Sequence, residues 1–372
     1  MALRMSLNDV LTRLRAEGLV DDDLATRSRE VMATHRKAEV GTPWFVKVLI
    51  GAGAWIAALF MVSFFVCVGL AKNEEALCGV GFLLVVSTLF LRRTGSGPFL
   101  EQLAVALCLT GAISMEVGCA QLFEHDATKV QVVVATVQII ICAGLLALYP
   151  DMLMRFMSTL GITSAAAVLA YEAAGAVGLA MMALVSAALM FVLFLSEPKL
   201  ARGRWAPWLR PVSLGLVCTV AGYLLFGWGM GRVPLGLDET LWGPSEAVLV
   251  TVGMTAMVCA TSWVILVEQD VNPMGLVAWS FIGTFVLLAV MTLHTPGIIT
   301  AVGILLLGFH RRDAVTLGLA VVFLLCFGSA YYYDLQLSLL AKSLALLGSG
   351  FVLLGARQLL LRRAPSLTTE VP

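Results

Sequence analysis

The chain has 372 residues, of which 60% are hydrophobic and 13% are charged, and its formal net charge at pH 7 is zero. Its mean hydropathy is +0.94, whereas an ordinary soluble domain carries roughly 25% charged residues. This composition, spread over many apolar runs of about 20 residues, excludes a typical soluble protein and predicts an all-α, polytopic helical membrane bundle. The balanced charge gives no basis for nucleic-acid binding.

Residues 1–40 form the only extended polar part of the chain and predict a short cytosolic helical hairpin. Gly18 ends the first helix, and Asp21 to Asp23 supply acidic residues at the N-terminus of the second. Two interpretations stay open for this hairpin. It is either a cap that lies against the membrane domain, which we favour, or a regulatory element that binds a partner.

The hydrophobic pattern from Trp44 onward predicts a membrane domain of about twelve transmembrane helices over residues 44–361. A tight hairpin around Glu172 to Gly178 separates the fifth helix from the sixth. Residues 362–372 are predicted to form a disordered cytosolic tail. The twelve spans are 44–70, 77–91, 101–122, 131–149, 155–172, 175–196, 209–229, 246–267, 273–293, 296–310, 314–332 and 335–361.

The distribution of basic residues predicts that both termini lie in the cytosol. With the N-terminus inside, nineteen of the 24 Lys and Arg residues fall on the cytosolic side and three on the opposite side. This asymmetry is typical of multi-pass membrane proteins, in which cytoplasmic loops are enriched in basic residues. Three of the cytosolic turns are spaced so that a triplicated four-helix unit is one interpretation, but the charge bias alone also places arginines there.

Two ionisable residues inside predicted spans are candidates for a functional pair. Glu116 lies about 9 Å from the outer end of the third span, and Lys342 lies about 10 Å from the outer end of the twelfth. Ionisable groups in membrane helices usually face the bundle interior and pair with one another. A Glu116–Lys342 pair is one interpretation, and outward snorkelling of the lysine side chain is the other.

A second group of candidates lies at the predicted outer ends of the helices. Tyr331, Tyr332 and Tyr333 precede Asp334, and Glu172 ends the fifth span. These side chains could line an outward-facing vestibule. An aromatic belt at the membrane interface explains the three tyrosines equally well, since such belts form regardless of function.

Metal and cofactor chemistry has no support in the sequence. The eight cysteines are scattered through apolar runs without a CxxC pair, and the four histidines lie in different segments without an HExxH pair. We therefore predict no metal site, no cofactor and no enzymatic activity. The cysteines are best interpreted as small buried side chains.

Both ends of the membrane domain resemble a known family. The segments "GTPWFVKVLIGAGAWIAALFMVSFF" (41–65) and "YYYDLQLSLLAKSLALLGSGFVLLGAR" (331–357) are similar to an uncharacterised bacterial inner-membrane family catalogued as a domain of unknown function. This family is often found with a small membrane protein named for its GDYxxLxY motif. The resemblance implies the fold, the inner-membrane location and a small membrane partner, and it implies no activity.

Two functional interpretations follow from these observations. The first is a non-enzymatic integral membrane protein that acts with a membrane or envelope partner, and it fits the sparse chemistry and the resemblance. The alternative is a secondary transporter or permease for an unidentified solute, which twelve spans with both termini inside would suit.

Overall fold

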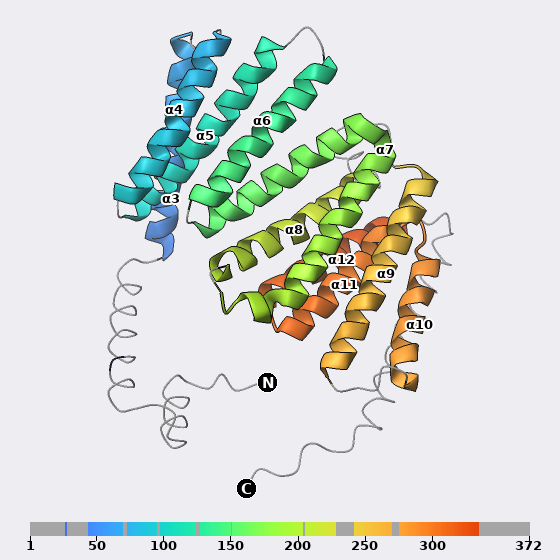
Figure 1. The fold of residues 1–372 in the computed structure, drawn as a ribbon. Helices are drawn as coiled ribbons and strands as arrows, with labels where there is room; N and C mark the ends of the chain where they lie inside the picture. Colours follow the sequence, from blue (N-terminus) through green and yellow to red (C-terminus); the bar gives the residue numbers. More distant parts are fainter. Residues whose placement is uncertain are drawn as a thin grey trace. The chain divides into compact units, whose positions relative to one another are not determined.

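A computed structural model describes most of the membrane domain. Regular structure within the described ranges is entirely α-helical (Figure 1), which confirms the predicted all-α class for this part of the chain. The predicted hairpin at 1–40 (apart from Arg27), the twelfth span at 335–361 and the tail at 362–372 lie outside the described residues. The described residues are 27, 44–69, 73–94, 97–123, 127–149, 151–203, 205–227, 242–269 and 275–334.

The chain divides into two compact units, Met1–Leu122 and Phe123–Pro372. The first contains α3 (Trp44–Cys67), α4 (Glu74–Thr94) and α5 (Pro98–Leu122), and α5 packs against both of the others. Helix α3 turns its small residues Ala54 and Ala58 inward and leaves most of its large apolar side chains exposed. Such a face suits contact with lipid.

Glycine allows α4 and α5 to approach each other closely. A Cβ atom on Gly81 would lie 2.6 Å from the Gly111 carbonyl oxygen, and one on Gly118 would lie 2.6 Å from Cys78 Sγ. Small residues commonly permit such packing between membrane helices. The same contact brings the free thiols of Cys78 and Cys119 to 3.7 Å, a proximity that the scattered cysteine spacing did not predict.

Six of the seven described helices of the second unit contribute side chains to one apolar core. Met190 of α7, Val217 of α8, Met254 of α9 and Leu307 of α11 are fully buried there. The described helices of this unit are α6 (Ala127–Leu148), α7 (Met152–Leu200), α8 (Ala206–Gly227), α9 (Pro244–Glu268), α10 (Leu276–Met291), α11 (Pro296–Arg311) and α12 (Ala314–Asp334).

Helix α7 is a hairpin of two helical arms. Its 49 residues would measure roughly 70 Å if straight, about twice the hydrocarbon thickness of a bilayer. The helical path breaks at Ala174 and at Gly175, whose φ of +58° and ψ of −141° favour glycine. Beyond the break, a Cβ atom on Gly178 would lie only 1.9 Å from the Ala170 carbonyl oxygen. The chain therefore folds back on itself, as the sequence predicts between residues 172 and 178.

Eleven of the twelve predicted spans lie wholly or mostly within the described ranges, and each of these overlaps an apolar helical segment there. The count of twelve transmembrane helices stays a prediction. Eight of the described helices are long and apolar enough to cross a membrane, and the hairpin α7 is one of these eight. Helices α10 and α11 are apolar but shorter, with 16 residues each. The chain is therefore a multi-pass membrane protein by length and composition.

Contacts between helix ends in the second unit agree with the predicted alternation of helix direction along the chain. At one end, the C-termini of α9 and α11 meet where Glu268 Oε2 lies 3.1 Å from His310 Nε2. At the other end, the Thr251 hydroxyl near the start of α9 donates to the Leu293 carbonyl just after α10, at 2.8 Å. Helix α9 is thus parallel to α11 and antiparallel to α10, as alternating spans require.

Candidate functional site

The predicted Glu116–Lys342 pair stays a prediction. Glu116 lies in α5 and is half-buried, in agreement with a position partly inside the first unit. Lys342 belongs to the segment after residue 334, which lies outside the described residues. Only one member of the predicted pair is therefore described.

The predicted outer vestibule is described only in part. The Tyr331 hydroxyl donates to the Met291 carbonyl at the end of α10, at 3.2 Å, so this tyrosine ties α12 to α10. Tyr332 and Glu172 are both half-buried. Tyr333 and Asp334 end α12, and their side chains are not among those described. A shared vestibule stays a prediction, and the packing role of Tyr331 is a finding that the sequence did not suggest.

A polar cavity that the sequence did not predict lies at the opposite end of the second unit. It measures about 200 Å³ and is formed by the ends of α7, α8, α11 and α12. Its charged groups are three guanidinium groups and two carboxylates. We call it the arginine pocket, and its lining residues are Phe194, Glu197, Arg210, Ser213, Leu214, Arg311, Arg312, Asp313 and Thr316.

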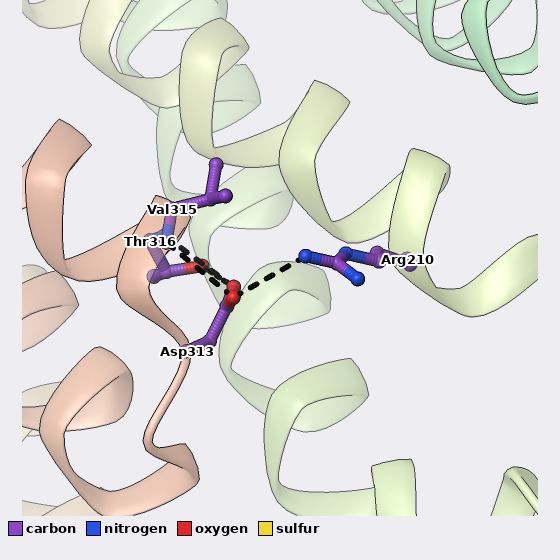
Figure 2. A network of polar contacts seen from close by, with 4 residues as sticks. All are labelled: Arg210, Asp313, Val315 and Thr316. Atoms are coloured by element: carbon purple, nitrogen blue, oxygen red, sulfur yellow. Dashed lines mark hydrogen bonds and ion pairs between the residues drawn. The ribbon is translucent and has the colours of Figure 1, made fainter. Parts of the chain in front are cut away.

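Asp313 organises one wall of the arginine pocket (Figure 2). Its carboxylate accepts hydrogen bonds from the Thr316 hydroxyl at 2.6 Å and from the backbone N–H groups of Thr316 and Val315 at 3.3 and 3.4 Å. It thereby caps the N-terminus of α12. One terminal nitrogen of Arg210 lies 3.5 Å from the same carboxylate, so α8 is joined to the start of α12.

These contacts keep Asp313 ionised. Partial burial alone would raise the pKa of the carboxyl group, but the hydrogen bonds from Thr316 and Val315 and the charge of Arg210 outweigh that effect and lower the pKa below its ordinary value. A carboxyl group with a lowered pKa in the folded state stabilises the fold above its unfolded pKa. That contribution is lost as the pH falls through the folded pKa.

Asp313→Asn is therefore expected to destabilise the protein at pH 7 and to matter progressively less below about pH 4, the ordinary range for an aspartate. The measurement is the midpoint of thermal unfolding in detergent, for the parent protein and for Asp313→Asn, between pH 3 and pH 7. We expect the difference between the two midpoints to narrow with acidification. A constant difference across this range would show that the charge of Asp313 contributes nothing.

Arg311, the last residue of α11, binds two backbone carbonyls of α7. Its Nε lies 2.9 Å from the Phe194 oxygen, and a terminal nitrogen lies 2.9 Å from the Leu195 oxygen. Pro198 follows Phe194 by four residues and has no N–H, so α7 cannot supply the usual donor to the Phe194 carbonyl. Arg311 supplies that donor and fixes the end of α11 to α7.

Arg155 makes the equivalent contact at the start of α8. Its NH1 lies 3.0 Å from the carbonyl oxygen of Pro207, and Pro211, four residues further on, lacks the N–H that would normally serve that carbonyl. The guanidinium also lies 4.6 Å from the centre of the Trp208 ring, a distance that allows a cation–π contact. Neighbouring side chains often satisfy carbonyls that proline frees in membrane helices. Two arginines expected only as charges in cytosolic turns thus hold helices together.

Among the described residues, no group of three or more His, Cys, Asp or Glu side chains is placed to hold a metal ion. The arginine pocket offers hydrogen-bond donors and charges of both signs at one end of the second unit.

Comparison with curated proteins gives no match, and comparison with solved structures gives none either. A family model described as a domain of unknown function, DUF4401, matches residues 43–363. The match includes nearly all of the two end segments that carry the resemblance seen in the sequence. The chain therefore belongs to the DUF4401 family of domains of unknown function.

Proposed function

We propose that this protein is a non-enzymatic, multi-pass protein of a bacterial inner membrane that acts by binding a membrane or envelope partner. The observation that carries the proposal is the arginine pocket, a charged cavity of about 200 Å³ where four helix ends meet. The apolar helices support a membrane location, and the resemblance seen in the sequence implies a bacterial inner membrane. The small GDYxxLxY-motif protein implied by the sequence resemblance is one candidate partner, and the lipid bilayer is another.

The charge distribution supports a cytosolic position for the pocket and for both termini. Arg155 contacts the start of α8, Arg210 contacts Asp313 just before α12, and Arg311 contacts the end of α7. All three contacts lie at the end of the second unit where the chain passes from α7 to α8. Basic residues near the ends of membrane helices mark the cytoplasmic side. We therefore place this end of the second unit at the inner surface of the membrane.

Photo-crosslinking from the rim of the pocket tests the proposal. Val315 adjoins Asp313 and is partly exposed, so a photoreactive amino acid at this position should reach whatever occupies the pocket. After irradiation of living cells, the purified chain is measured by intact mass. We expect a crosslinked adduct whose amount is strongly reduced in the double variant Arg210→Ala, Arg312→Ala. Arg202 is an exposed arginine outside the pocket lining, so Arg202→Ala should leave the amount of adduct unchanged.

The outcome separates the competing interpretations. An adduct that requires Arg210 and Arg312 supports a binding function, whether its mass is that of a protein or of a small molecule. If the adduct is absent, or is indifferent to those two residues, the pocket is not the binding site. Uptake of a solute by the purified chain alone in proteoliposomes would instead favour the transporter alternative.

A further inference from the structure

The arginine pocket continues into an apolar groove on the outside of the bundle. The groove has a volume of about 420 Å³ and lies between the end of α11 and the start of α12. Arg312 and Asp313 line both the pocket and the groove, so the polar space and the apolar space adjoin. We call this second space the apolar groove, and its lining residues are Gly308, Phe309, Arg312, Asp313, Ala314 and Leu317.

The floor of the apolar groove is backbone. A Cβ atom on Gly308 would lie 2.9 Å from the Leu317 nitrogen, so α11 and α12 approach each other here without intervening side chains. Phe309 stands at the side of the groove with 76% of its surface exposed. In a helix that crosses a membrane, an exposed phenylalanine beside a shallow groove offers a surface for a hydrocarbon chain.

The charges of the arginine pocket are unequally available to a ligand. Arg311 holds the carbonyls of Phe194 and Leu195, and the Asp313 carboxylate is occupied by Thr316, Val315 and Arg210. Arg312 is exposed, and the Arg210 side chain is 58% exposed and uses one nitrogen for its ion pair. Guanidinium groups carry five donors in a fork that matches phosphate oxygens. Arg210 and Arg312 therefore offer donors to an anion.

We propose that the arginine pocket and the apolar groove together bind one phospholipid molecule, with its phosphate at Arg210 and Arg312 and an acyl chain along Phe309 and Leu317. The three guanidinium groups outnumber the two carboxylates in the lining, which complements one phosphodiester charge. Basic pockets between membrane helices on the cytoplasmic side commonly bind lipid head groups. This inference rests on the proposed function, because it names the chemistry of the partner that occupies the same pocket.

The test is a titration of the full-length, delipidated protein in detergent, followed by native mass spectrometry. The probe is dioleoylphosphatidylglycerol. Dioleoylglycerol has the same chains without the phosphate, and glycerol 3-phosphate has the phosphate without the chains. We expect bound phosphatidylglycerol to exceed bound dioleoylglycerol and bound glycerol phosphate by at least tenfold at equal concentration.

Variants assign the binding to the two spaces. The double variant Arg210→Gln, Arg312→Gln should weaken phosphatidylglycerol binding about tenfold or more. Phe309→Gln changes an exposed side chain of the apolar groove, leaves both arginines in place, and should also weaken binding. Arg202→Gln is the matched control and should bind as the parent chain does. Each variant is checked by its thermal unfolding midpoint, and Arg312→Gln alone replaces the double variant if that chain fails to fold.

Two results would overturn the lipid site. Equal binding of dioleoylglycerol would show that the phosphate is not recognised, and equal binding of glycerol phosphate would show that the site takes a free phosphate. Unchanged binding in both the arginine variant and Phe309→Gln would place the lipid elsewhere. If photo-crosslinking at Val315 still gave an adduct of protein mass that depends on the arginines, the proposed binding function would stand without this inference.

Discussion

Arg311→Met is expected to destabilise the second unit by about 2 to 3 kcal/mol, because two charge-assisted hydrogen bonds are lost and the Phe194 carbonyl is left without a donor. Arg311 donates to the Phe194 and Leu195 carbonyls, and Pro198 prevents α7 from serving the first of these itself. Methionine keeps much of the length of the side chain but cannot donate. The measurement is the midpoint of thermal unfolding in detergent.

A second substitution tests the physical reason for this loss. Pro198→Ala restores a backbone N–H four residues after Phe194, so the helix can satisfy that carbonyl without Arg311. The combination of Arg311→Met with Pro198→Ala should therefore recover a large part of the loss, which makes the two changes strongly non-additive. Arg202→Met is the matched control and should have little effect. Purely additive losses in the double variant would contradict the account of Arg311.

Gly178→Ala is expected to cost about 3 kcal/mol or more, at the upper end of what overpacking usually costs. The new Cβ atom would lie 1.9 Å from the Ala170 carbonyl oxygen, a backbone atom that no change of rotamer can move away. The two arms of α7 would have to separate just beyond their turn at Gly175. We expect a low yield of folded protein and a clearly lowered unfolding midpoint.

Gly222→Ala provides the matched control for that prediction. Gly222 also lies inside a helix of the second unit, but a Cβ atom there would meet no atom within 4 Å. Alanine favours a helix over glycine by about 1 kcal/mol, so this variant should be neutral or slightly more stable. Equal tolerance of both substitutions would mean that the arms of α7 do not approach each other as described.

The sequence predicted well where the described helices lie along the chain, because hydropathy and length determine which segments can cross a membrane. Even the hairpin inside α7 was predicted, since Glu172 and two nearby glycines interrupt a long apolar run. Its exact position depends on the backbone at Ala174 and Gly175. Composition alone also gave the all-α class.

The candidate site was not predicted, for two physical reasons. Arg210 and Asp313 are separated by about a hundred residues and meet only because α8 packs near the start of α12, a contact that apolar periodicity does not specify. In addition, arginines at helix ends were interpreted as markers of the cytosolic side. A proline four residues after a carbonyl, as at Pro198 and Pro211, is the local signal that could have suggested a donor from another helix.

An ionisable residue inside a membrane span is the usual sequence signal for a functional site. That signal selected Glu116 and Lys342 because an ionisable group in hydrocarbon is costly without a partner. The charges that form the arginine pocket lie instead at helix ends, where water and lipid head groups meet and an arginine needs no special explanation. Its placement becomes informative only when the carbonyls of neighbouring helices are known.

The central claim is that the two ends of α7 and the arginine pocket lie at one membrane surface, with the turn at Gly175 at the other. It is tested most directly by cysteines introduced at Met152, Ala173 and Ala201, which are exposed positions, and labelled with a membrane-impermeant thiol reagent. Labelling is measured in intact spheroplasts and in inverted vesicles, above the level of the parent chain. We predict that Ala173→Cys reacts from outside and that Met152→Cys and Ala201→Cys react only from the cytosolic side. Labelling of Ala173→Cys and Ala201→Cys from the same side would contradict the account.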